Sequence, residues 1–237
     1  MHKKLEQMLE KNLRGNAAHD AFGKVITSAV HTSSRCQRNW NLDKKISTQD
    51  LKVIETALTA CPSKQNYIFY KPYMITHRET IDKIYHCTSD GSNNWPDGKP
   101  QLNPQCLAQL LIVFTWSDEY IKQVEGDNIA HLYRNDEVKK ELESGKEHPN
   151  IDFQRVISIG LAAGYVNLAA NMLGYRTGCC TCFDPQAVGR IIKSSGRPIL
   201  LMGVGIADES RPRREHHKNR NVIFPSHDKS LESIKVA

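Results

Sequence analysis

The segment from Asp152 to Leu173 constrains the fold of this chain more than any other. Its apolar residues recur at spacings of three and four, which is the period of an α-helix; they are Ile157, Leu161, Ala162, Tyr165, Leu168, Ala169 and Met172. Many of their neighbours are small, and small side chains let helices approach closely. We therefore expect a central helix that stops at Gly174.

Shorter elements surround this helix in the sequence. The first forty residues are helical in pattern, and a further helix begins at Ser47 and Thr48 and ends before Pro62. Two more helices are predicted at residues 78–86 and 185–193. Strands are predicted at residues 67–76, 110–116 and 198–206, with a short extended stretch after Gly174. No glycine-rich dinucleotide or phosphate-loop motif accompanies them, and their interleaving lacks the regular rhythm of a doubly wound nucleotide fold.

The bulk composition fits one domain. The 237 residues, 39% of them hydrophobic, suffice for a sizeable core. We expect a single domain over residues 1–237, with a helical extension at about 1–30 and a charged insertion at about 125–150. The excess of 32 Lys and Arg over 26 Asp and Glu is mild. It suits a phosphate-bearing small ligand, and no long basic tract points to nucleic acid.

The ends of the chain and its cysteines bear on location. The N-terminus is charged and shows no secretion signal, and no apolar stretch approaches eighteen residues, so we expect no membrane span and a cytoplasmic protein. Seven cysteines are present, three of them at Cys179, Cys180 and Cys182. Cysteines this close together are poorly placed to form disulfides between distant loops, so reduced thiols are expected.

Two polar segments in the first third of the chain are candidates for ligand binding. The loop Ser34, Arg35, Cys36, Gln37 and Arg38 carries two guanidinium groups, which suit a phosphate or a carbonyl-rich ring edge. The alternative is an exposed loop whose arginines pair with surface acids.

The second segment is a turn that joins a predicted helix to a predicted strand. It consists of Pro62, Ser63, Lys64, Gln65 and Asn66. Its hydroxyl, amine and amide groups suit a polar heterocycle. The same residue types are also ordinary turn formers.

Two further candidates lie later in the sequence. Cys179, Cys180, Thr181 and Cys182 follow two glycines, where backbone N–H groups can approach a flat ligand. A buried strand explains these residues equally well, and a metal site completed by His216 and His217 is a third interpretation, disfavoured because adjacent cysteines chelate poorly in a tetrahedral site.

The basic run that includes Arg211, Arg213 and Arg214 suits phosphate capture. A solvated tail is the commoner explanation of such a run.

Taken in order, these segments resemble the nitroreductase superfamily of FMN-dependent flavoproteins. The resemblance covers roughly residues 30–220. It rests on Arg38-Asn39-Trp40 before a helix, on Pro62, Ser63 and Asn66 in a P-S-x-x-N turn, on the closing pair Arg213-Arg214, and on a G-x-A-A-x-x-x-x-L-A-A-x-x-L-G helix at residues 160–174. More narrowly, residues 34–40, 61–66 and 174–180 are similar to nitroreductase-like proteins of marine phages, which would place the protein in the host cytoplasm.

The resemblance implies a fold, a cofactor and an activity. The fold would be an α+β three-layer sandwich with a central, mostly antiparallel sheet flanked by helices, in an intertwined homodimer. The helix from Asp152 to Leu173 would lie in the core or at the dimer interface. FMN would be bound by the four segments above and by Asn103, and NAD(P)H would reduce it before a nitroaromatic, quinone or similar acceptor reoxidises it in a ping-pong cycle. Arg38 would stabilise the reduced flavin, a backbone N–H near Thr181 would face N5, and Arg213, Arg214 and Arg35 would hold the phosphate. No side chain would be essential to the chemistry.

Two alternatives to this activity stay open. One is a flavin-consuming or dehalogenating enzyme of the same fold, because a fold does not determine a function. The other is a non-enzymatic protein that binds flavin, or a metal through the clustered cysteines and histidines.

Overall fold

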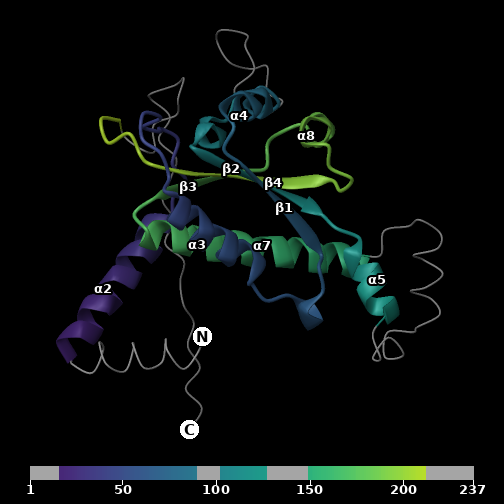
Figure 1. Cartoon of the computed structure of the whole chain (residues 1–237), viewed down its shortest axis with the longest axis horizontal. Helices are drawn as coiled ribbons and strands as arrows, with labels where there is room; N and C mark the ends of the chain where they lie inside the picture. The colour runs from purple at the N-terminus through teal and green to yellow at the C-terminus, as the bar shows by residue number, and fades with distance from the viewer. Residues whose placement is uncertain (1–15, 90–101, 127–148, 212–237) are drawn as a thin grey trace.

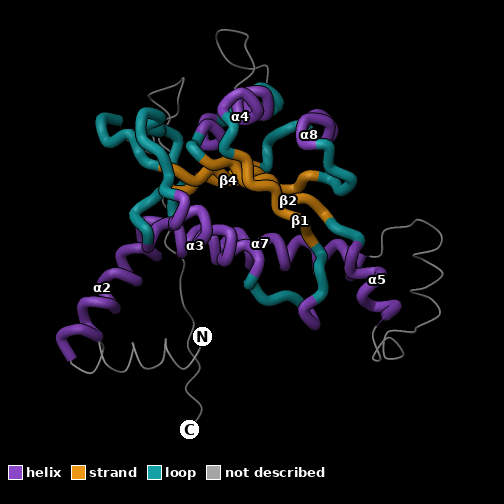
Figure 2. The backbone as a smooth tube through the Cα atoms, in the orientation of Figure 1, coloured by secondary structure: helices purple, strands orange, loops and turns teal. Residues whose placement is uncertain are grey.

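The computed structural model describes residues 16–89, 102–126 and 149–211. Its centre is a four-stranded sheet in the order β1-β2-β4-β3, in which every neighbouring pair is antiparallel. Helices cover both faces of this sheet, so the protein is a three-layer α+β sandwich (Figures 1 and 2). This confirms the predicted fold class.

The two middle strands form the centre of the core. Strand β2 (Leu110–Trp116) lies between β1 (Tyr70–Ile75) and β4 (Pro198–Gly205). Residues Leu110 to Phe114 have no exposed surface, so both faces of β2 are buried. A continuous apolar run is what a strand covered on both faces requires.

One face of the sheet is covered by α3 (Thr48–Thr59) and α7 (Pro149–Met172) (Figure 1). As predicted, Ser47 caps α3: its hydroxyl accepts a hydrogen bond from the backbone N–H of Asp50 at 3.0 Å. Helix α2 (Asn16–Ser33) packs on the C-terminal part of α7, where the Asn167 side chain donates to the carbonyl of Ser33 at 3.1 Å.

The other face is covered by α4 (Arg78–Tyr85), α8 (Pro185–Ile192) and the short 3-10 helix η2 (Pro104–Leu107) (Figure 2). Edge strand β3 (Arg176–Cys180) completes the sheet. The predicted stop at Gly174 is confirmed, because this residue has the left-handed φ of +89° that ends a helix and disfavours a side chain.

One predicted boundary shifts, and one helix was not predicted. The strand predicted from residue 67 begins only at Tyr70, because Tyr67 and Phe69 turn into a separate aromatic cluster with Tyr120. Helix α5 (Glu119–Gly126) was not predicted. The charged insertion lies almost wholly outside the described residues, as do residues 1–15 of the N-terminal extension. Within the described ranges, no helix is both long and apolar enough to cross a bilayer.

The apolar residues that predicted α7 divide between its two sides. Ala162 is buried, whereas Ile157, Leu161, Tyr165 and Met172 are exposed. The residues that pack on the sheet and α3 are mostly smaller: Ile159, Ala162, Ala163, Val166 and Ala170. The helix is apolar all round, so periodicity alone does not tell which side faces the core.

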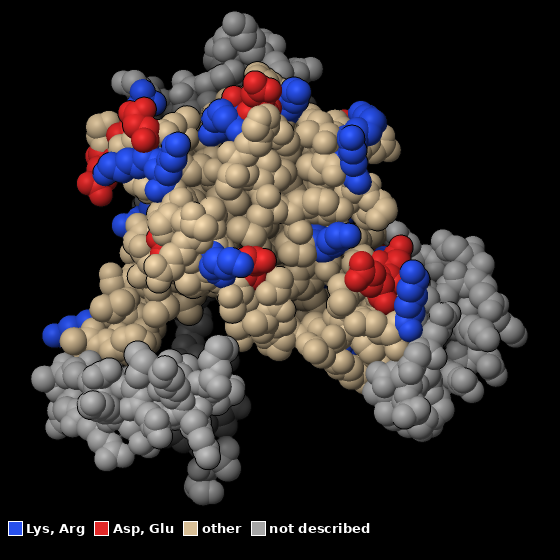
Figure 3. Space-filling model, viewed as in Figure 1, with Lys and Arg blue, Asp and Glu red and all other residues tan. Residues whose placement is uncertain are grey.

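Charged side chains lie mainly at the periphery of the face in Figure 3. Blue and red groups are neighbours there, around a broad uncharged centre. On α3, Lys52 and Glu55 form an ion pair at 3.9 Å. That face therefore shows no field of a single sign.

Candidate functional site

The loop at residues 34–41 runs along the β3 edge of the sheet. The backbone N–H of Gln37 donates to the carbonyl of Thr177 at 2.7 Å, and that of Asn41 donates to Ile206 at 2.9 Å. Asp208 in turn donates its N–H to the carbonyl of Asn39 at 3.1 Å. Three candidate segments, the loop, β3 and the residues after β4, are therefore joined by backbone hydrogen bonds.

Close backbone approach at Gly178 fixes the inner wall of this region. A Cβ at this position would lie 2.5 Å from the Gln37 carbonyl oxygen and 2.6 Å from the Gln105 Cβ, so only glycine fits. The side-chain oxygens of Gln37 and Gln105 are buried, and no described residue gives them a hydrogen bond. Buried acceptors of this kind are normally satisfied, so they mark a place for a missing donor.

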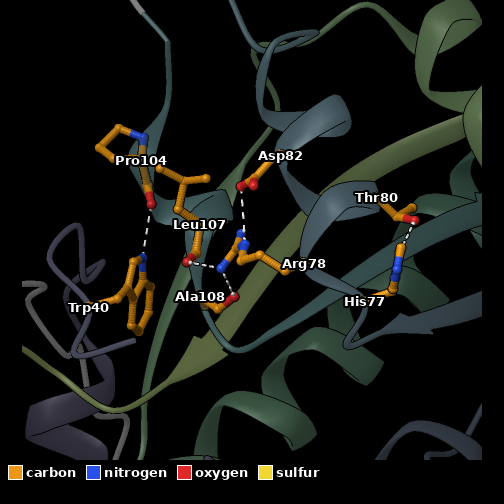
Figure 4. A network of polar contacts seen from close by, with 8 residues as sticks. All are labelled: Trp40, His77, Arg78, Thr80, Asp82, Pro104, Leu107 and Ala108. Atoms are coloured by element: carbon orange, nitrogen blue, oxygen red, sulfur yellow. Dashed lines mark hydrogen bonds and ion pairs between the residues drawn. The ribbon is translucent and has the colours of Figure 1, made fainter. Parts of the chain in front are cut away.

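Helix η2 brings Asn103 and Gln105 to the end of β3. The Asn103 side chain donates to the carbonyl of Cys182 at 3.1 Å, and the Gln105 side chain donates to that of Cys179 at 3.3 Å. Figure 4 shows how η2 is held: Trp40 donates its indole N–H to Pro104 at 2.9 Å, and Arg78 donates to Leu107 at 3.0 Å. The predicted residue Asn103 thus lies against the cysteine segment.

Cationic groups surround the same region. Arg35 and Ser34 are exposed, Arg38 is half-buried, and Arg211 is exposed beside Asp208 at 4.0 Å. Arg213 and Arg214 lie outside the described residues. Three predicted arginines therefore lie on the loop and the post-β4 segment that border β3, with Arg211 toward its Arg176 end, whereas the exposed Thr181 and Cys182 follow its Cys180 end.

The cysteines of β3 alternate between the two faces of the sheet. Cys179 contacts the core on the α7 side, and burial raises its pKa to about 12. Cys180 belongs to the core on the α4 side; a hydrogen bond from Cys106 lowers its pKa, and the nearby Arg38 lowers it further. All seven cysteines are free thiols. Among the described residues, no group of three or more His, Cys, Asp or Glu is arranged to hold a metal ion, and His216 and His217 lie outside that part of the chain.

The turn at residues 62–66 lies elsewhere. Tyr175, at the C-terminal end of α7, donates its hydroxyl to Asp50 in the first turn of α3 at 2.6 Å, so α3 and α7 are antiparallel and α3 begins near β3. The turn follows the other end of α3, and twelve helical residues span about 18 Å. Within one chain, the structure does not bring Pro62–Asn66 to the other predicted residues.

The turn itself is rigidly held. Gln65 and Asn66 both have left-handed backbone conformations, with φ of 52° and 60°, and the Ser63 hydroxyl donates to the carbonyl of Tyr67 at 2.7 Å. Next to it, Phe69 stacks on Tyr120 with ring centroids 5.1 Å apart. The guanidinium of Arg155 lies 5.6 Å from the Tyr120 ring centroid and pairs with Asp118 and Asp152. Pro62, Lys64, Gln65 and Asn66 nevertheless present their side chains to solvent.

Two glutamines around the site, Gln105 and Gln109, were missed from the sequence, whereas Gln37 lay within the candidate loop. The Gln109 side chain donates to Asn41 at 2.5 Å and accepts from the N–H of Ile206 at 3.1 Å, which fixes the loop to the end of β4. A glutamine directly before a fully apolar strand is unusual enough to signal such a role. Gln37 and Gln105 carry no comparable signal.

Comparison with known proteins identifies the fold. No protein-family model matches the chain, and no curated protein matches it at a significant level. Solved structures match with probability 1.00. A Streptococcus pneumoniae protein of the nitroreductase family has a TM-score of 0.57 at 18% identity, with 86% of this chain and 98% of that one covered. The chain has the nitroreductase fold.

Two other structures with the nitroreductase fold carry information on cofactors. One from Exiguobacterium sibiricum, described as a nitroreductase, was determined in complex with FMN; its TM-score is 0.59 at 16% identity, over 86% of this chain and 93% of that one. One from Staphylococcus epidermidis is described as an NAD(P)H:FMN oxidoreductase. Its TM-score is 0.58 at 16% identity, with 88% of this chain and 92% of that one covered. At sequence identities this low, the similarity to these structures shows a shared fold only.

Proposed function

We propose that this protein is an FMN-dependent NAD(P)H oxidoreductase that reduces nitroaromatics, quinones or similar electron-poor small molecules in the cytoplasm. The observation that carries the proposal is the backbone hydrogen bonding that joins the Arg-bearing loop at residues 34–41 to β3 and to the residues after β4, in a fold shared with an FMN complex. Flavin enzymes need cations and backbone donors placed together in this way, because the cofactor carries the redox chemistry and the protein orients it.

The residues present fit FMN. Its phosphate calls for guanidinium groups, which Arg35 and Arg211 present to solvent. The pyrimidine edge of its ring carries one N–H and two carbonyls. The donor side chain of Arg38 and the partnerless acceptor oxygens of Gln37 and Gln105 lie at the same end of the sheet. No dinucleotide fingerprint is present for FAD.

When bound, FMN supplies hydride acceptance from NAD(P)H and hydride donation to the acceptor molecule. The task of Arg38 is electrostatic, since a cation beside the pyrimidine ring favours the reduced, anionic form. The backbone N–H near Thr181 orients the reactive nitrogen. Arg35, Arg211, Arg213 and Arg214 hold the phosphate. The reaction asks for no general acid or nucleophile among these side chains.

We also propose that the active form is a homodimer, because one chain holds the candidate groups at two ends. The turn at residues 62–66 lies at one end of α3, and the loop at residues 34–41 lies near the other. Two copies packed antiparallel along α7 would bring the turn of each copy to the loop of its partner. The turn's exposed Lys64, Gln65 and Asn66 would then complete the flavin site.

The outer side of α7 supplies a surface for this dimer. We call it the α7 outer face; it consists of Phe153, Val156, Ile157, Gly160, Leu161, Gly164, Tyr165 and Met172, all exposed in the single chain. Phe153 is 60% exposed and Tyr165 47%. Large exposed apolar surfaces of this kind mark interfaces. Phe22, Val25 and Val30 of α2 add further exposed apolar side chains.

The proposal is tested by purifying the protein, releasing its cofactor by heat and identifying it by chromatography. We expect FMN, a dimer in sedimentation analysis, and NAD(P)H oxidation that depends on an added nitroaromatic or quinone. FAD, or no flavin in a well-folded preparation, would contradict the proposed cofactor. Bound FMN without acceptor-dependent NAD(P)H oxidation would contradict the reductase activity and favour a flavin-binding protein.

A further inference from the structure

Five of the seven thiols gather around the β3 end of the sheet. They come from three separate segments: Cys36 from the loop, Cys106 from η2, and Cys179, Cys180 and Cys182 from β3 and the residues after it. The Cys36 thiol donates to the carbonyl of Cys179 at 3.8 Å. The proposed reductase activity assigns no task to any thiol, so this cluster is unexplained by it.

Within the cluster, Cys106 and Cys180 form a pair. Both belong to the same buried core on the α4 side of the sheet, with exposures of 0% and 4%. The nearness of the two thiols raises the pKa of Cys106 and lowers that of Cys180. Cys179, next in sequence, packs on the opposite face of the sheet. The geometry therefore selects one partner for Cys180 out of several nearby cysteines.

Cys182 connects this buried pair to solvent. It is exposed, as is Thr181 before it. The Cys180 thiol points toward it and donates to its carbonyl oxygen at 3.5 Å. A buried thiol pair with an exposed thiol at its mouth is the arrangement that passes a disulfide inward by successive exchange.

We propose that Cys182, Cys180 and Cys106 form a thiol–disulfide exchange site for small disulfides. Cys182 attacks one sulfur of the incoming disulfide, and the first thiol leaves. Cys180 then attacks the Cys182 sulfur and displaces the second thiol. Cys106 attacks Cys180 and releases Cys182, which leaves a Cys106–Cys180 disulfide.

The exchange balances without any further reactant. The small disulfide gains two electrons and takes up the two protons that Cys106 and Cys180 lose, so it leaves as two thiols. The protein pair loses those two electrons and forms one S–S bond. Because neither flavin nor NAD(P)H takes part, the proposal goes beyond the reductase activity and does not depend on it.

The experiment exposes the reduced, purified protein to oxidised glutathione and follows intact mass and linkage maps. We expect two of the seven thiols to disappear, the protein to lose two hydrogen atoms, and the peptide containing Cys106 to be linked to the one containing Cys180. Flavin absorbance recorded in the same samples keeps this result separate from the proposed function, since the linkage is expected whether or not flavin is bound.

Three variants assign the steps. Cys182→Ser should slow formation of the linkage about tenfold or more, because the entry thiol is lost. Cys180→Ser should abolish the linkage, and Cys179→Ser is the matched control that should retain it. The proposal is wrong if glutathione remains attached to Cys182 without an internal linkage, if no thiol reacts, or if the linkage forms in Cys182→Ser as fast as in the wild type. The wild-type linkage map decides the matter even if a variant folds poorly.

Discussion

The two faces of α7 differ in a way that reverses the usual distribution of side chains. The inner face carries mainly small residues, among them Ala162, Ala163 and Ala170, and these pack against the sheet and α3. The α7 outer face carries the larger Phe153, Leu161 and Tyr165, and these are exposed. Small residues inside bring the helix close to its own chain. Large apolar residues outside are costly to leave in water, which supports the homodimer proposed above.

The largest expected effect is on the inner face. Val166→Glu should destabilise the protein by about 3–5 kcal/mol, because Val166 has no exposed surface and a buried charge there has no partner. Chemical denaturation of the variant measures the change. A stability near that of the wild type would show that the inner face is not the core-facing one.

The matched change on the outer face is Leu161→Glu, five residues away on the same helix. We expect the monomer to stay folded and the dimer to weaken by about 2–4 kcal/mol, the range of a well-packed interface residue. Circular dichroism and sedimentation at several concentrations measure both. FMN affinity should fall as well, since the turn of one copy would complete the site of the other. A dimer of unchanged affinity would contradict the assignment of this face.

Arg38→Ala sharpens the comparison, because it changes the site without touching either face of α7. The flavin potential should fall and reduction by NAD(P)H should slow, with a loss of about 1.5–3 kcal/mol for one charge-assisted hydrogen bond. The dimer should remain intact, unlike in Leu161→Glu. A flavin-loaded variant with unchanged potential and unchanged reduction rate would rule out the role given to Arg38.

The smallest effect concerns the contact between α3 and the end of α7. Tyr175→Phe removes the hydrogen bond that most lowers the pKa of Asp50. Because the pKa of Asp50 is lowered in the folded protein, this carboxylate stabilises the fold at pH values above its ordinary pKa of 3.8. The stabilisation is lost as the pH falls through the lowered pKa. The variant should therefore be slightly less stable at neutral pH, and the difference should shrink at acid pH. Thermal unfolding at both pH values measures it; an equal difference at both would contradict the linkage.

Much of the fold was predictable because local signals agreed with it. The strand Leu110–Trp116 and the cap at Ser47 were predicted at the residues where they occur. The inner face of α7 was not, since an all-apolar helix gives the same period for both faces. For the site, the arginines and cysteines stood out by type, and the structure joins several of them.

The buried amides were beyond the reach of the sequence. Gln37 and Gln105 matter through their closeness to Gly178, which depends on contacts between segments about seventy to one hundred and forty residues apart. The separation of the turn at residues 62–66 from the rest of the site had no local signal either. It follows from the antiparallel packing of α3 and α7.

The left-handed pair Gln65 and Asn66 has a consequence for protein engineering. Two successive non-glycine residues in this conformation are strained, and glycine at either position would relieve the strain in the folded chain. Glycine would also give the unfolded chain more freedom, which opposes the gain. The present residues hold the turn in one conformation. In the proposed function this turn completes the flavin site, so selection for thermal stability at these positions would not select for flavin binding. Screens that reward only a higher Tm should therefore leave residues 65 and 66 unchanged.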